Sequence, residues 1–445
     1  MIATRPDLNL EKYRKAVSRI DTVRANGRVG QLVGVLVESC GPPCGVGEIC
    51  EIHGGRNDQP VLAEVVGFRE NRTLLMPYGA INNIKPGSAV IARGSSLRVT
   101  VGSCLLGRVL DGLGRPLDNG PPIAGKDEIT AASTPPHPLA RTRIHDALSF
   151  GVRAIDGTLT IGKGQRIGIF SGSGVGKSIL MGMIARNTAA DVNVIALIGE
   201  RGREVRDFLE KDLGPEGLAR SVVIVATSDQ APVVRLRGAQ VATGIAEYFR
   251  DLGKDVLLMM DSITRVAWAQ REIGLASGEP PTTRGYTPSV FAALPQLLER
   301  AGTSEKGSIT GLYTVLVEGD DMNEPVADTV RGILDGHIVL TRELAARNHY
   351  PAIDVLASVS RLMVDVTTRE HRDCAGKLRD VLATYKASED LINIGAYANG
   401  SNAGVDYALT KIDPANAFLR QGMDERSDLA GARAALMGLF GDETL

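Results

Sequence analysis

Short apolar runs separated by turn residues characterise the chain between Arg28 and Val101. The runs are rich in residues that favour strands, and Gly, Pro and Asn interrupt them. They cover residues 28–39, 47–52, 60–68, 72–79 and 88–93. Closely spaced short strands of this kind usually close into a small barrel. The pattern therefore predicts an N-terminal β-barrel.

Longer apolar runs that alternate with segments of helical spacing follow in the central part of the chain. The runs are nearly continuous in apolar residues and cover 166–170, 192–200, 221–228, 255–261, 308–318 and 336–341. Strands that are buried on both faces have this composition, because a parallel sheet is covered on each side. The alternation predicts a parallel sheet with helices on both faces.

After about Val366 the pattern becomes helical. The apolar residues that repeat at helical spacing there are Leu378, Val381, Leu382, Tyr385, Leu391 and Ile394. The tail 428–440 also has a helical pattern, and the Gly- and Pro-rich stretch 102–138 indicates a junction. We therefore expect domains at 1–98, 99–365 and 366–445.

Composition narrows the class of protein. The chain has 445 residues, of which 43% are hydrophobic, but no uninterrupted apolar stretch is long enough to cross a membrane. Residues 1–20 are charged and lack the apolar segment of a signal peptide, so we expect a soluble, cytoplasmic protein. The net charge of -2 gives no general attraction to nucleic acid. Aromatic residues make up only 4% of the chain, so few side chains could stack on bases.

The five cysteines are an odd number, and three of them lie close together in "CGPPCGVGEIC". A metal site would need further His or Cys ligands at a suitable spacing, and none follows nearby. Free thiols in a reducing compartment are favoured over a metal site.

The stretch "SGSGVGKS" at residues 171–178 indicates phosphate binding. Glycines let the backbone bend so that successive N–H groups surround an anion, Lys177 adds a positive charge, and the Ser178 hydroxyl is a magnesium ligand. The usual pattern G-x-x-x-x-G-K-[ST] is incomplete, because Ser171 holds the position of the first glycine. An apolar run before it and a helical segment after it supply the expected strand-loop-helix setting, whereas a glycine-rich turn with an incidental lysine is the alternative.

Carboxylates follow two of the predicted strands. Ligands bind beyond the carboxyl ends of a parallel sheet, so Asp261 and Glu200 are expected near the phosphate loop. Asp261 would hold the magnesium shell, or else it caps the helix that begins at Ser262. Glu200 would polarise the attacking water of a hydrolysis, and Glu204 would reach the water shell of the metal. A solvated charged loop is the alternative for both glutamates.

Six stretches resemble, in chain order, the catalytic-subunit family of rotary ATPases, and more closely its type III protein export branch. They lie at residues 171–178, 197–205, 256–273, 278–291, 318–344 and 349–361, the last reading "HYPAIDVLASVSR". The resemblance implies an α/β fold with an N-terminal small β-barrel, a central RecA-like parallel-sheet ATPase domain and a C-terminal helical domain. "INIGAYANGS" at 392–401 is more similar to the flagellar export ATPase than to the injectisome ATPase.

The resemblance also assigns roles to residues. It implies Lys177, Glu200, Arg201 and Arg361 in catalysis, with Glu200 as the base that Arg201 orients and Arg361 as an arginine finger in the neighbouring subunit's site. Tyr350 would pack against adenine. ATP would be bound by the phosphate-loop residues Ser173, Gly174, Val175, Gly176, Lys177, Ser178 and Ile179, and Mg²⁺ by Ser178, Glu204 and Asp261. A surface salt bridge for Arg361 and a core aromatic for Tyr350 are the alternatives.

Together these observations predict a Mg-dependent ATPase that assists type III protein export, with the flagellum favoured over the injectisome. A non-catalytic ring subunit and an RNA translocase are the alternatives. The carboxylate at Glu200 argues against the first, and the low aromatic content argues against the second.

The resemblance implies a homo-hexamer that works with a stator-like regulatory protein, a stalk protein, export chaperone-substrate complexes and a membrane export gate. No nucleic-acid partner is expected. The protein would be cytoplasmic and peripheral at the inner membrane near the export apparatus. The helical pattern at residues 9–20 is a candidate site for the regulator, and 395–406 is expected near a central channel.

Overall fold

The computed structural model describes residues 14, 26–54, 59–317, 319 and 321–441. Apart from residue 14, the predicted helix at 9–20 lies outside the described residues. The described residues divide after Ser96 into two compact units. The three-domain division expected from the sequence stays a prediction.

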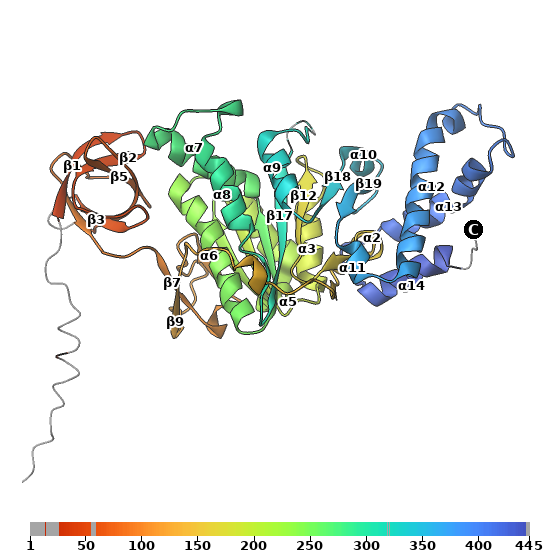
Figure 1. The fold of residues 1–445 in the computed structure, drawn as a ribbon, viewed down its shortest axis with the longest axis horizontal. Coiled ribbons are helices and arrows are strands. Elements are labelled where there is room, and N and C mark those ends of the chain that lie inside the picture. Colours follow the sequence, from red (N-terminus) through yellow and green to blue (C-terminus); the bar gives the residue numbers. More distant parts are fainter. Residues whose placement is uncertain (1–13, 15–25, 55–58, 318, 320, 442–445) are drawn as a thin grey trace, which may run out of the picture. The chain divides into compact units, whose positions relative to one another are not determined.

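The first unit contains a closed six-strand barrel with the strand order β1-β2-β5-β4-β3-β6, as predicted (Figure 1). Its strands are β1 (Asn26–Val33), β2 (Leu36–Cys40), β3 (Ile49–His53), β4 (Val61–Arg69), β5 (Arg72–Pro77) and β6 (Ala89–Ala92). The predicted run 28–39 is two strands rather than one, because the chain turns at Gly34, where φ is 58°. This left-handed conformation suits glycine, which has no Cβ to clash. Val37, Ile52 and Leu75 fill the interior.

The second unit is built on a nine-stranded sheet with the order β19-β18-β12-β17-β15-β13-β14-β8, in which β16 pairs with β17. The strand pairs are parallel except for those made by β19 and β16. The strands are β8 (Val109–Asp111), β12 (Arg166–Ser171), β13 (Val192–Ile198), β14 (Ser221–Ala226), β15 (Asp255–Asp261), β16 (Gly302–Thr303), β17 (Ser308–Leu316), β18 (Gly336–Leu340) and β19 (Ile353–Ser360).

All six predicted apolar runs of the central part are strands of this sheet. The stretch 102–138, expected to be only a connection, contributes edge strand β8 and half of a small sheet formed by β7 (Arg98–Val101) and β9 (Asp127–Thr130). The three-residue length of β8 gives too little alternation to be distinguished from a loop.

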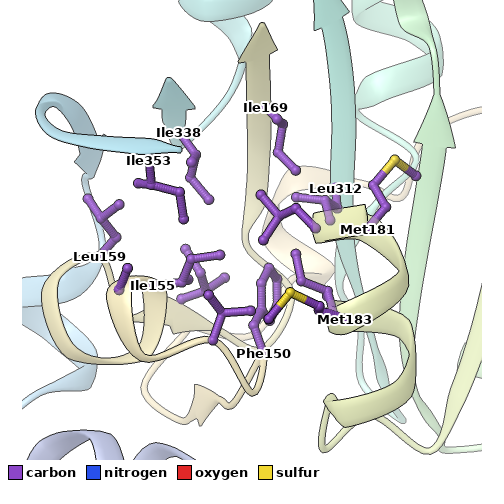
Figure 2. Close-up of a cluster of buried hydrophobic side chains, with 14 of the residues drawn as sticks. Phe150, Ile155, Leu159, Ile169, Met181, Met183, Leu312, Ile338 and Ile353 are labelled. Atoms are coloured by element: carbon purple, nitrogen blue, oxygen red, sulfur yellow. The ribbon is translucent and has the colours of Figure 1, made fainter. Parts of the chain in front are cut away.

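Two hydrophobic cores cover the two faces of the sheet. Ile195 and Leu197 of β13 face one core, and Val194 and Ala196 face the other. The first core includes α2 (Arg153–Thr158) and α3 (Lys177–Asn187), and Figure 2 shows Phe150, Ile155 and Met183 gathered there against Ile169 and Ile338 of the sheet. The second core packs beneath α6 (Pro232–Asp251), α7 (Ile263–Ser277), α8 (Pro288–Leu298) and α9 (Pro325–Ile333).

The C-terminal part is helical, as expected: α12 (Arg369–Asn393) and α14 (Leu429–Phe440) cover the two predicted helical patterns, and α13 (Ala403–Leu419) lies between them. They join the first core through α2: His371 Nε2 lies 2.8 Å from the carbonyl oxygen of Gly157, and Phe418 leaves no room for a side chain at Gly157. Leu378 and Val381 are buried as expected, but Leu391 and Ile394 are exposed, Ile394 by 75%. Their helical spacing continues beyond the part of α12 that other helices cover.

The remaining elements are short. They are β10 (Ala147–Leu148), β11 (Ile161–Gly162), α4 (Gly202–Asp207), a π-helix (Phe208–Leu213), α5 (Gly214–Ala219), α10 (Arg342–Ala346), α11 (Met363–Val366) and 3-10 turns at Ser103–Leu105, Pro138–Ala140 and Thr283–Gly285. Within the described residues, no helix combines the length and the apolar character that crossing a membrane requires.

Candidate functional site

The loop between β12 and α3 has the geometry of an anion site. Gly174 and Gly176 have φ values of 80° and 87°, in the left-handed region. Gly176 is also the N-cap of α3, and no side chain accepts a hydrogen bond at this cap. The first N–H groups of a helix have no acceptor within the helix, so here they are open to an anion such as a phosphate.

Ser171 fits the position at which the usual pattern has glycine. It is the last residue of β12, is buried and has no positive φ, so its backbone does not require glycine. Within the loop Val175 is buried, whereas Ser173, Gly174, Ser178 and Ile179 are exposed. The exposed residues leave the helix start accessible to a ligand.

Lys177 connects this loop to the two predicted strand-end carboxylates. Its Nζ forms an ion pair with Asp261 and lies 3.9 Å from Oε1 of Glu200. The three residues meet because β12, β15 and β13 run parallel and end at one edge of the sheet, where Asp261 pairs in register with Leu197. The structure therefore brings together a lysine and two carboxylates that lie far apart in the sequence.

Asp261 is held by a residue that the sequence analysis did not identify. Oγ1 of the buried Thr314, on β17, donates a hydrogen bond of 2.7 Å to Oδ1 of Asp261. The helix that follows Asp261 is capped by Ser262, whose Oγ accepts a hydrogen bond of 3.3 Å from the N–H of Arg265. Ser262 therefore takes the capping role considered for Asp261. Only the pairing of β17 with β15 could have pointed to Thr314.

Burial and charge make Glu200 an acid with an unusually high pKa. Removal from water and the negative charge of Asp261 raise the pKa of Glu200 to about 7, although Lys177 opposes the shift. A hydrogen bond between the side chains of Glu200 and Glu204 also raises the pKa of Glu200 and lowers the pKa of Glu204. A carboxyl group with a pKa near neutrality is suited to accepting and releasing a proton.

Arg201 lies away from the carboxylate that it was expected to orient. Its side chain is 81% exposed, and its Nη1 lies 3.5 Å from Oε1 of Glu204. In this structure it pairs with Glu204, on the first turn of α4, rather than with Glu200. The role of Arg201 in orienting Glu200 stays a prediction.

Tyr350 lies at the same edge of the sheet as the phosphate loop. Because β19 runs antiparallel to β18, its start is level with Leu340, which also pairs with Ser171. A Cβ atom added at Gly176 would lie 3.4 Å from Cε1 of Tyr350. The tyrosine is 41% exposed. One part of its ring thus contacts the loop and another part is open to a flat ligand.

Arg361 lies at the opposite end of the strands, where β12 and β18 begin. Ser360 pairs with Gly336 at the start of β18, and the N–H of Arg361 donates a hydrogen bond of 3.0 Å to the carbonyl oxygen of Asp335. Asp335 in turn bonds to Arg166, the first residue of β12. The length of β12 therefore separates Arg361 from the loop, a distance of about 17 Å. Arg361 is not brought to the site of its own chain.

The side-chain oxygen atoms at the site suit a hard cation that also binds oxygen atoms of a ligand. The hydroxyl of Ser178 and the carboxylates of Asp261 and Glu204 are oxygen donors, which Mg²⁺ prefers. Among the described residues no three His, Cys, Asp or Glu side chains form a group that could hold a metal by themselves. Mg²⁺ usually completes its shell with water and substrate phosphates, so such a group is not required. All five cysteines are free thiols.

Comparison with known proteins finds relatives whose sequences match most of this chain. Family models match residues 29–94 (ATP synthase alpha/beta family, beta-barrel domain), 151–360 (ATP synthase alpha/beta family, nucleotide-binding domain) and 367–438 (T3SS EscN ATPase C-terminal domain). The "Flagellum-specific ATP synthase" of Bacillus subtilis is 56% identical, over 96% of this chain and 98% of its own length. The "Type 3 secretion system ATPase" of Xanthomonas euvesicatoria is 51% identical, over 96% of each chain.

A solved structure shows the same fold. The assembled ATPase EscN from the type III secretion system of enteropathogenic E. coli superimposes with a TM-score of 0.88 at 46% identity, covering 93% of this chain and 99% of EscN. A second structure, of assembled EscN with its central stalk EscO, gives a TM-score of 0.86 at 45% identity, with the same coverage.

Proposed function

The chain belongs to the ATP synthase alpha/beta family, in the branch of flagellum-specific and type III secretion ATPases, and from this premise we propose that its site hydrolyses Mg-ATP in the service of protein export. The observation that carries the proposal is the convergence of Lys177, Asp261 and Glu200 beside an anion-binding loop. Hydrolysis of a nucleoside triphosphate needs positive charge at the phosphates and a carboxylate near the attacking water.

Each residue has a role in this proposal. The loop N–H groups and Lys177 bind the phosphates, and the ring of Tyr350 packs against adenine. When ATP binds, Nζ of Lys177 exchanges Asp261 for a phosphate oxygen. Ser178, Asp261 and, through water, Glu204 would hold Mg²⁺, which neutralises charge on the phosphates when bound.

Glu200 accepts the proton of the attacking water. The water oxygen forms a bond to the terminal phosphorus as the bond to the bridging oxygen breaks, and ADP and phosphate leave. The near-neutral pKa of Glu200 lets it pass the proton on afterwards. This carboxylate separates the proposed enzyme from a non-catalytic ring subunit, which needs no base.

The position of Arg361 supports a site shared between subunits. At the far edge of the sheet Arg361 is exposed, and its guanidinium donates a long hydrogen bond, of 3.5 Å, to the carbonyl oxygen of Arg331. From there it would enter the site of the next subunit and stabilise charge on the transferring phosphoryl group. A homo-hexameric ring satisfies this requirement, and the name of the EscN structure describes that ATPase as assembled.

Relatives of both export machines are similar to this chain, and we assign it to the flagellum. The flagellar relative from B. subtilis is 56% identical, against 51% for the secretion ATPase of X. euvesicatoria. Its partners would then be a stalk protein, a stator-like regulator, chaperone-substrate complexes and the membrane export gate, with the ring at the cytoplasmic side of the inner membrane.

Two experiments test the proposal. The purified chain should release phosphate from ATP only with Mg²⁺, its rate should not rise with RNA, and Lys177→Ala should abolish it. Absence of turnover with Mg²⁺ would favour a scaffold, and strong stimulation by RNA would favour a translocase. Expression in a flagellated bacterium that lacks its export ATPase should restore motility, whereas restored secretion only in an injectisome mutant would reassign the machine.

A further inference from the structure

Arg265 joins the strand end that carries Glu200 to the only tryptophan of the chain. A Cβ atom added at Gly199 would lie 2.7 Å from Cβ of Arg265, and its three nearest heavy atoms all belong to that side chain. The aliphatic stem of Arg265 therefore lies directly on the backbone that precedes Glu200. At the other end, Cζ of Arg265 lies 4.6 Å from the centroid of the Trp268 ring, within cation-π range.

Trp268 continues this contact chain to Tyr286. The indole Nε1 donates a hydrogen bond of 3.1 Å to Oη of Tyr286, which is only 4% exposed. The ring of Tyr286 also makes an edge contact with Phe291, at 5.9 Å between centroids. Tyr286 is thus fixed between α7 and α8, which pack on the same face of the sheet (Figure 1).

Tyr286 in turn anchors an exposed segment. Its carbonyl oxygen accepts hydrogen bonds from the N–H and the Oγ1 of Thr282, at 2.6 and 2.7 Å. Residues 280–284 are all exposed, and Arg284 reaches Asp321 with a hydrogen bond of 2.8 Å. The contacts therefore run from the backbone at Gly199, next to Glu200, through Arg265, Trp268 and Tyr286 to the surface.

From this chain of contacts we infer that Arg265 is a positioning residue that couples the nucleotide state at Glu200 to the conformation of segment 280–284. The inference rests on the proposed function, because it requires a nucleotide that binds beside Glu200 and shifts the backbone at Gly199. That backbone has no side chain of its own to absorb a shift, so the shift is passed to the stem of Arg265. The guanidinium then moves over the indole, and the hydrogen bond to Tyr286 carries the change to the segment.

A second arginine near the same rings provides a matched control. Cζ of Arg271 lies 5.9 Å from the Trp268 centroid and 5.3 Å from the Tyr286 centroid. It contributes none of the atoms nearest to Gly199. Loss of Arg271 should therefore change the surroundings of both rings without interrupting the path from the nucleotide site.

Trp268 makes the coupling measurable, because every change in intrinsic tryptophan emission comes from this residue. Wild-type protein with Mg²⁺ and a non-hydrolysable ATP analogue should show an emission change that saturates with nucleotide binding measured by calorimetry. Arg265→Met keeps the stem and removes the charge, and at saturating nucleotide the change should fall about fivefold or more. Arg271→Met should keep the wild-type amplitude.

Hydrogen exchange of segment 280–284 tests the far end. In wild-type protein its protection should differ between nucleotide-free and nucleotide-bound states, and Arg265→Met should remove this difference. Tyr286→Phe leaves the nucleotide site intact and removes the hydroxyl that bonds to Trp268 and to Glu324, so it should reduce the same difference even if the Arg265 variant fails to fold.

The outcomes separate this inference from the proposed function. If wild-type protein does not bind the analogue, both are wrong. If it binds the analogue and neither the Trp268 emission nor the exchange of the segment changes, only the coupling is wrong. A response of wild-type size in both Arg265→Met and Tyr286→Phe would also overturn the coupling.

Discussion

Lys177, at the start of α3, forms an ion pair with Asp261, at the end of β15, across 84 residues of sequence. In this structure the lysine is thus held by the carboxylate that would face the metal in the proposed nucleotide complex. The pair keeps both charges compensated in a largely buried position, where an unpaired charge would be costly. A phosphate and a cation can then replace the two partners without leaving either side chain uncompensated.

Thr314→Val should impair turnover without greatly disturbing the fold. The substitution conserves the shape of the side chain but removes the hydrogen bond to Asp261. Because a hydrogen bond to a charged group contributes more free energy than one between neutral groups, its loss should lower turnover roughly tenfold. Steady-state ATP hydrolysis measures this. The control is Thr310→Val on the same strand, whose hydroxyl accepts from the N–H of Gly164. It should lower the melting temperature and leave turnover close to wild type, and equal turnover losses in both variants would remove the special role of Thr314.

Arg361→Ala should leave nucleotide binding nearly unchanged and lower turnover on the order of 10³-fold, because the guanidinium acts only on charge that develops during transfer. Calorimetry and phosphate release measure the two effects.

Mixing this variant with Lys177→Ala subunits tests action in trans. Mixed rings contain some interfaces in which an intact Lys177 meets an intact Arg361, so part of the activity should return. Mixed rings that stay as inactive as either variant alone would contradict a shared site.

Tyr350→Ala should raise the KM for ATP about tenfold, because the open face of the ring would no longer cover the base. Tyr350→Phe keeps the ring and should stay near the wild-type value. Substrate saturation curves with ATP distinguish the two variants. An unchanged KM in Tyr350→Ala would place adenine elsewhere.

Much of this site could be predicted from the sequence, since the glycine-rich loop marks one strand end and the apolar runs place Glu200 and Asp261 at others. Thr314 and Arg265 could not be found in this way. Their importance depends on which strand neighbours β15 and on which side chain covers Gly199, and neither leaves a periodic signal. The distance of Arg361 from its own loop likewise depends on β19 being antiparallel.

The C-terminal helices show a related limit. The spacing of Leu391 and Ile394 continues the helical pattern, yet both residues are exposed and α12 ends at Asn393, before Ile394. Periodicity identifies the face of a helix but does not show where its covering neighbours end. In the barrel, a single turn at Gly34 divided a run that looked like one strand, because both flanking segments have the same apolar character.

Asp156 should make stability depend on pH in an unusual direction. Burial raises the pKa of this fully buried carboxyl to about 6, although Ser149 and the N–H groups of Phe150 and Gly151 bond to it. The folded protein holds this proton more tightly than the unfolded chain, in which the Asp156 carboxyl has its ordinary pKa of 3.8. The contribution of this group to stability is therefore largest at low pH and is lost as the pH rises through about 6.

Asp156→Asn cannot lose a proton, so its stability lacks this component. Relative to the variant, wild-type protein should lose about 2 kcal/mol of unfolding free energy between pH 4.5 and pH 7.5. Denaturant unfolding of both proteins at the two pH values measures this difference. The other titrating groups contribute equally to the unfolding free energy of both proteins, so their contributions cancel. A difference that is the same at both values would show that Asp156 titrates normally in the folded protein.

The most direct measurement for the catalytic assignment is single-turnover hydrolysis of bound Mg-ATP by Glu200→Gln. Glutamine keeps the size of the side chain and the loop around it but cannot accept a proton at neutral pH. The variant should bind ATP about as well as wild-type protein and hydrolyse it roughly 10² to 10⁴ times more slowly. Hydrolysis by Glu200→Gln at a rate close to that of wild type would contradict the account.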